Sequence, residues 1–146
     1  MAMTFKIDAS QFEAAMQAEK SKLREAARPA AQAGAQVIYE AARQNALMLA
    51  SDKEHYFYGR NKRRYGPFQP GNLARAIYQV FSKTESRDDR PVYHVSWNAD
   101  KAPYAWMVEY GTSKASAHSF LGRAITEKRR EAMEALRRRF IEEVKK

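Results

Sequence analysis

The stretch from residue 102 to residue 125, APYAWMVEYGTSKASAHSFLGRAI, constrains the fold more than any other part of the sequence. Its second residue, Pro103, disfavours helix at Ala102 and permits one from Pro103 onward. A short helix should follow, because three apolar residues recur at helical spacing and would share one face: Tyr104, Met107 and Val108. Trp106 and Tyr110 would lie together on a flank of this helix.

The short helix should stop at Gly111, since glycine accepts the left-handed conformation that ends helices. Thr112 to Ser119 is small and polar, as expected of a loop that runs close over another element. Phe120 and Leu121 then begin a long charged helix. The result is a compact corner that packs a helix onto a sheet or onto a neighbouring subunit. Glu109 within it has two interpretations: a salt bridge to a neighbouring subunit, or a local hydrogen bond to the loop amides of Thr112 or Ser113.

The first 50 residues are rich in alanine and predict a long helix, with Ser10 as N-cap and Glu13 at the capping-box spacing. Pro29 predicts either a kink or the first turn of a second helix. Gly34 either weakens this helix or marks a close packing contact. Thr4 to Ile7 alternates apolar and polar residues, so it is a short strand or a tail.

Residues 51–71 break every period, and they predict a long aromatic and basic loop rather than a regular element. Three interpretations are open: a subunit-contact loop, a solvated mobile loop, or a contact to nucleic acid. We expect the loop to be mobile in a free subunit and ordered in an assembly. The aromatic residues that would reach a neighbour are Tyr56, Phe57, Tyr58 and Phe68.

The remaining residues predict a hairpin and a closing helix. Leu73 to Ile77 reads as a helical turn, residues 77–82 and 91–97 as two β-strands, and residues 85–90 as the charged turn between them. The last helix runs from Ser119 to Lys146 with one apolar stripe. The fold class is therefore α+β, with long N-terminal and C-terminal helices packed on a small antiparallel sheet.

A search for catalytic or metal-binding groups finds none. No histidine or acid follows His55, His94 or His118 by three or four residues, the spacing expected of a zinc site. His94 falls on the polar face of a strand. The adjacent acids Asp88 and Asp89 are typical of a turn. There is no glycine-rich phosphate loop and no nucleophile elbow. We expect no enzymatic activity and no cofactor.

The length and charge of the chain indicate the number of domains and the kinds of partner. A chain of 146 residues is one domain, and a net charge of +9 favours association with polyanions without specifying any. The absence of cysteine suits a reducing compartment. No apolar run approaches the roughly 20 residues of a membrane span, so no membrane partner is expected.

Three short motifs resemble a bacteriophage family, the tail-completion or head–tail joining proteins that are minor tail components of long-tailed phages. The first is Tyr104-Ala105-x-x-Val108-Glu109-Tyr110-Gly111-Thr112-Ser113-Lys114. The second is residues 119–124, SFLGRA, with Ser119 where the family has proline. The third is residues 71–77, GNLARAI, with Ala76 where the family has serine. Together the resemblance covers roughly residues 10 to 140.

The resemblance implies a non-enzymatic virion component, made in the host cytoplasm and placed at the head-proximal end of the tail. Copies would form a closed ring, expected to be a hexamer, that joins the tail to the head connector and lets DNA pass. Its neighbours would be other neck proteins: the connector, the tail tube or a terminator. The candidate contact residues are Tyr56, Phe57, Tyr58, Phe68, Tyr104, Trp106, Glu109, Tyr110, Gly111, Thr112 and Phe120. The alternative is a small basic nucleic-acid-binding protein that uses the last helix and the aromatic loop; Arg137 to Arg139 would either contact DNA or form a solvated helix face.

Overall fold

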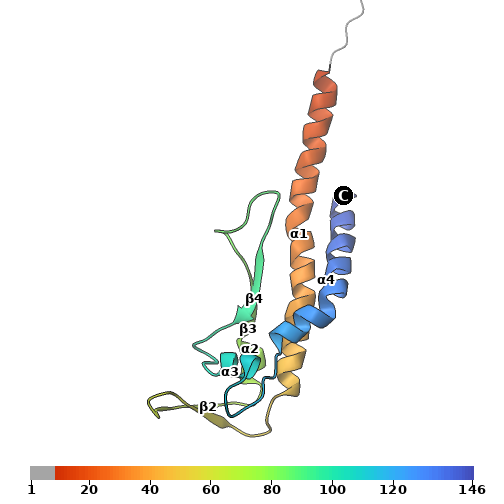
Figure 1. Ribbon diagram of the computed structural model, residues 1–146. Helices are drawn as coiled ribbons and strands as arrows, with labels where there is room; N and C mark the ends of the chain where they lie inside the picture. The colour runs from red at the N-terminus through yellow and green to blue at the C-terminus, as the bar shows by residue number, and fades with distance from the viewer. Residues whose placement is uncertain (1–8) are drawn as a thin grey trace, which may run out of the picture.

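The computed structural model describes residues 9–146 and has an α+β fold (Figure 1). The expected strand or tail at Thr4–Ile7 lies outside the described residues. The elements in chain order are α1 (Ser10–Met48), β1 (His55–Tyr58), β2 (Arg64–Phe68), α2 (Asn72–Ala76), β3 (Ile77–Phe81), β4 (Tyr93–Trp97), α3 (Ala105–Tyr110) and α4 (Leu121–Val144).

The two long helices pack against each other in antiparallel directions, and α1 also contacts β3, β4 and α2. Their close approach depends on small residues. A Cβ atom on Gly34 of α1 would lie 3.2 Å from the carbonyl oxygen of Ala132 on α4. Gly34 therefore marks a close packing contact, as one of the two interpretations held. At about 1.5 Å per residue, α1 is about 58 Å long and α4 about 36 Å, so α1 continues past the end of α4.

Two expectations for α1 are wrong. The helix is unbroken through Pro29, so no second helix begins there. Proline inside a helix costs about 3 kcal/mol, which is offset here by 39 residues that are mostly good helix formers and by packing on α4. The N-cap is Ala9 rather than Ser10, and Ser10 is the first helical residue. The amide of Glu13 donates to the Ala9 carbonyl at 2.9 Å, so the helix begins with a backbone bond and not with a capping box.

The predicted hairpin at residues 77–97 is confirmed. β3 and β4 pair antiparallel with Ile77 opposite Trp97 and Phe81 opposite Tyr93. Arg87 and Arg90 exchange both of their backbone hydrogen bonds at 3.0 Å, so Asp88 and Asp89 occupy a tight turn as expected. His94 points to solvent, where its Nε2 atom lies 2.9 Å from the carboxylate of Glu85.

Residues 51–71 are not an irregular loop, and this expectation is corrected. β1 and β2 form a second antiparallel pair, separate from β3–β4, with Phe57 opposite Tyr65 and Tyr58 opposite Arg64. Burial alternates along β1, and aromatic residues are strong strand formers. The alternation lasts only four residues and was masked by the charges that follow it. We call this element, residues 55–68, the ribbon; in Figure 1 it extends sideways from the end of the molecule where α1 finishes.

The core is small and lies where the C-terminal half of α1, α2, α3, β3 and the start of α4 meet. Ten of the thirteen buried hydrophobic residues in the described chain are alanine, so close helix approach replaces large side chains. The large members are Leu73, Ile77 and Phe120. The largest buried side chains therefore gather at one end of the molecule, whereas α1 and α4 pack along their shared length, and Ala26, Ala30 and Ala132 are buried outside this cluster. Residues 9–25, which include the start of α1, are exposed.

Candidate functional site

The site residues around the corner are organised by the carboxylate of Glu109, which caps α4 from the last turn of α3. Its Oε2 atom accepts from the amide of Leu121 at 3.0 Å, and its Oε1 atom accepts from the amide of Gly122 at 2.9 Å and from Ser119 Oγ at 2.7 Å. These amides have no partner inside the helix, and the start of a helix attracts negative charge. Phe120, the N-cap residue, supplies no side-chain cap, so Glu109 takes that role from another element.

This geometry corrects the expectations for Glu109. Glu109 is only 7% exposed, and both of its carboxylate oxygens accept hydrogen bonds within the subunit. It is therefore not placed for a salt bridge to a neighbouring subunit. It does bind local amides, but those of α4 rather than those of Thr112 or Ser113. Ser119 lies one position before the N-cap and is a donor to Glu109, not the N-cap itself.

Gly111 ends α3 in a conformation that is strained for other residues. Its φ is +76° and its ψ is 176°, an extended positive-φ region that only glycine adopts readily, and not the left-handed helical region expected. A Cβ atom here would lie 2.7 Å from the amide nitrogen of Ala117. The chain then folds back on α3, because the His118 amide donates to the Val108 carbonyl at 2.7 Å. Glycine is needed at this position for both its conformation and its size.

Thr112 shapes the loop that follows. Its amide donates to the Ala115 carbonyl at 2.8 Å, and its Oγ1 atom accepts from the amides of Ala115 at 3.1 Å and Lys114 at 3.3 Å. Thr112 is therefore a turn-forming residue whose hydroxyl is occupied inside its own loop.

Phe120 ties the corner to the rest of the molecule. Its side chain is 1% exposed and meets Trp97 of β4 edge to face, with ring centroids 5.6 Å apart. Asn45 of α1 donates from Nδ2 to the Phe120 carbonyl at 3.0 Å. The start of α4 is thus held by α1, by β4 and by Glu109, so Phe120 is a core residue and not a contact to a partner.

Tyr104 connects the corner to the base of the ribbon. Its ring meets His55 at 5.0 Å and Phe68 at 5.1 Å between centroids, both in edge-to-face geometry. Its hydroxyl accepts from Asn72 Nδ2 at 3.1 Å. Burial raises the pKa of the Tyr104 phenol above its ordinary value, although the hydrogen bond from Asn72 and the charge of Arg75 act in the opposite direction.

Of the eleven candidate residues, five are exposed: Thr112, whose hydroxyl is used within its own loop, and four aromatic residues. Trp106 and Tyr110 are 53% and 73% exposed on the outer side of α3, which we call the α3 flank. Tyr56 and Tyr58 are 42% and 63% exposed on the outer face of the ribbon. Phe57 and Phe68 alternate to its other face, where Phe57 packs on Tyr65 and Phe68 on Tyr104. The candidates therefore divide into a structural corner and two exposed aromatic surfaces.

The structural roles of two asparagines and a glycine in this site were not predicted from the sequence. Asn45 and Asn72 bridge elements with side-chain hydrogen bonds, and a Cβ on Gly122 would lie 3.0 Å from Glu109 Oε1. An asparagine within a helical apolar pattern, where it is a poor helix former, was the only available signal for Asn45. A glycine two residues into a long helix was the signal for Gly122.

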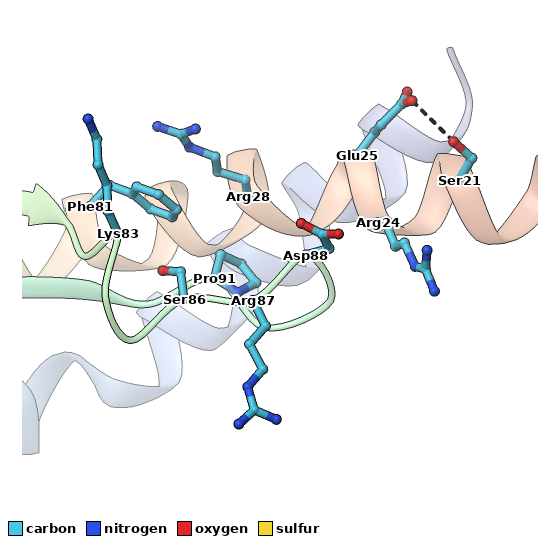
Figure 2. A pocket seen from close by; sticks show the side chains of 10 residues that line it. All are labelled: Ser21, Arg24, Glu25, Arg28, Phe81, Lys83, Ser86, Arg87, Asp88 and Pro91. Atoms are coloured by element: carbon cyan, nitrogen blue, oxygen red, sulfur yellow. Dashed lines mark hydrogen bonds between the residues drawn. The ribbon is translucent and has the colours of Figure 1, made fainter.

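A hollow lies beside these residues, and a larger groove lies elsewhere on α1. The first, about 380 Å³, lies beside Tyr104 and is mostly apolar, with lining from Ala46, Leu49, Leu73, Val108, His55 and His118. It could accept an apolar side chain. The second is an open groove of about 740 Å³ between α1 and the β3–β4 turn, shown in Figure 2.

The cations of the second groove do not converge on one point. In Figure 2, Arg28 and Lys83 extend to one side, whereas Arg24 and Arg87 extend to the other. The Arg28 guanidinium lies 3.9 Å from the centre of the Phe81 ring, so it is engaged in a cation–π contact. This groove is therefore not built as a compact anion site.

No group of three or more potential metal-ligating His, Asp or Glu side chains occurs within residues 9–146. In the same residues, no helix is both long and apolar enough to cross a membrane.

Comparison with known proteins found no matching family model, no matching curated protein and no matching solved structure.

Proposed function

We propose that this protein is a ring-forming structural component at the head-proximal end of a phage tail, which joins the tail to the head connector. The proposal combines the motif resemblance with one structural observation: the subunit is far from compact. Its accessible surface is 11338 Å², whereas a compact monomer of 16.8 kDa would expose about 7,600 Å². A chain with this excess of surface is suited to work within an assembly.

The exposed surface is also apolar where a subunit contact would need it to be. Sixteen large hydrophobic residues in the described chain are exposed, against three that are buried. Every residue from 9 to 25 is exposed, and we call residues 10–25 the α1 arm. It carries Phe12, Met16 and Leu23, and Phe12 is 67% exposed. An isolated helical arm of this length is marginal in water, so packing on a neighbour would stabilise it.

A closed ring requires two different patches on each subunit, because its contacts run head to tail. The α1 arm and the α3 flank meet this requirement. Figure 1 shows the arm at one end of the molecule and α3 near the other. The corner gives the α3 flank a rigid base, since Glu109 and Gly111 fix the end of α3 on which Trp106 and Tyr110 stand.

Complementation of a phage that lacks this gene tests the proposal. The deletion should yield DNA-filled heads and separate full-length tails in electron micrographs, and the native chain supplied from a plasmid should restore joined particles. Trp106→Ser combined with Tyr110→Ser should fold but fail to restore them. Tyr78→Ser is the control, because Tyr78 is an exposed tyrosine on β3 and not part of α3.

Joined particles in normal numbers without the gene would contradict the proposed function. Full rescue by the double variant would contradict the α3 flank as a contact.

A further inference from the structure

The ribbon carries a concentration of charge that ring assembly does not explain. Residues 55–68 contain four cations and no acid: Arg60, Lys62, Arg63 and Arg64. All four are exposed. Within residues 9–146, none of them lies within ion-pair distance of a carboxylate, whereas α4 pairs Arg123, Lys128 and Arg139 with glutamates of the same helix. The ribbon is thus a short segment of four exposed cations that has no acid of its own.

The cations are presented by an ordered turn rather than by a loose loop. Gly59 donates to the Arg63 carbonyl and Lys62 to the Gly59 carbonyl, both at 2.9 Å. Asn61 Oδ1 accepts from the Arg63 amide at 3.1 Å, and Lys62 holds a positive φ of 61°. These bonds gather three cations within one turn. A held turn loses little freedom when it binds, which favours a fixed set of charge contacts.

The tyrosines on the ribbon support the cations. The Arg64 guanidinium lies 4.6 Å from the centre of the Tyr56 ring, and that of Arg63 lies 5.5 Å from Tyr65. Guanidinium groups stacked on rings keep their N–H donors free for bidentate contacts to phosphate. At the other end of the ribbon, His55 and Phe68 pack on Tyr104 and anchor it to the corner.

We propose that the ribbon is a nucleic-acid arm that contacts the phosphate backbone of duplex DNA without reading its sequence. A two-stranded ribbon has the width to enter a major groove. The cations supply phosphate contacts, and nothing in the turn forms the paired amide or guanidinium geometry against base edges that sequence recognition needs. The inference goes beyond the proposed function, and it holds or fails on the isolated protein whether or not the protein forms a ring.

Titration of a labelled DNA duplex with the full chain at several salt concentrations tests whether the ribbon binds DNA. The ribbon variant combines Arg60→Ser, Lys62→Gly and Arg63→Thr; glycine adopts the positive φ of Lys62 freely, so the turn is retained. The control variant removes the same number of charges from α4, where Arg129, Arg130 and Arg137 are exposed and have no carboxylate within ion-pair distance. Each of these is changed to Gln. Circular dichroism and thermal midpoints establish that both variants fold.

The native chain should bind with an affinity that falls steeply with salt and does not depend on base sequence. Each lost phosphate contact lowers the slope of log affinity against log salt by about 0.9, so the ribbon variant should lose about 2–3 units of slope and at least ~10-fold in affinity. The control should lose less than half of that.

Four results would overturn the inference. Equal losses in both variants would mean that only net charge matters, and a larger loss in the control would place the contact on α4. Tighter binding of a single strand than of the duplex would assign the exposed tyrosines to base stacking instead. Absence of DNA binding by the native chain at low salt would exclude a nucleic-acid role for the ribbon. If the ribbon variant then also failed to form oligomers, the ribbon would be a contact to a protein partner.

Discussion

At the scale of single residues, the corner depends on Glu109 and Gly111, which have different roles. Glu109 supplies the acceptors for the start of α4, and Gly111 lets the chain turn back after α3. The sequence located both residues and predicted the turn at Gly111. It did not predict the partners of Glu109, because Leu121 and Gly122 lie 12 and 13 residues further on and come close only once the loop has folded.

Replacement of Gly111 by valine should destabilise the protein by at least about 1–3 kcal/mol, the cost of a strained backbone position, with a further penalty for the clash with Ala117. Denaturant unfolding measures this loss. Ser116→Val, a change in an exposed part of the same loop, should be within about 0.5 kcal/mol of the native protein. Equal stability of Gly111→Val and the native chain would refute the turn geometry.

Replacement of Glu109 by alanine should cost about 2–4 kcal/mol, since two helix amides and a hydroxyl lose their acceptor in a part-buried setting. Glu109→Gln keeps one acceptor oxygen and should cost less than half of that. If the two variants unfold at the same denaturant concentration as the native protein, Glu109 is not the cap of α4.

Tyr104 predicts a pH effect. Burial raises the pKa of its phenol in the folded state, so folding favours the protonated form. The stability that this gives is fully present below the unfolded pKa of about 10 and is lost as the pH rises through the folded pKa. Tyr104→Phe keeps the ring contacts and cannot ionise. Its unfolding free energy, measured from pH 8 to 11, should fall less at alkaline pH than that of the native chain. Parallel curves would contradict the raised pKa.

At the scale of elements, the sequence predicted the helices and the β3–β4 hairpin because their apolar residues recur at regular spacing over enough positions to identify each element. It missed the ribbon because β1 offers only four residues of alternation, followed by a turn dense in charge. It allowed a break at Pro29 because the packing of α4 along α1, which holds the helix together there, is a tertiary contact.

The α1 arm allows an element-scale prediction. Deletion of residues 1–20 would leave Ser21 as a favourable N-cap, and none of the residues buried within 9–146 lies in the deleted segment. The thermal midpoint of the remaining chain should therefore change by less than about 5 °C, while self-association should be lost. A deletion that keeps the native oligomer would remove the arm from the ring contacts.

At the scale of the whole molecule, the core is small and rich in alanine because most of the large hydrophobic residues in the described chain are exposed. The described chain has its largest buried side chains at one end and leaves many large hydrophobic residues exposed. Composition does not show this, because 45% hydrophobic residues is ordinary for a compact domain. Only the structure shows which of those residues are outside. In the ring that we propose, copies of the subunit would cover part of this exposed surface.

Native mass spectrometry of the purified full-length chain is the most direct test of the proposed ring. The account predicts one closed species with a uniform copy number, expected to be six, that is replaced by monomer when Trp106→Ser and Tyr110→Ser are combined. A chain that stays monomeric up to several hundred micromolar, or one that forms open polymers of mixed length, would contradict it.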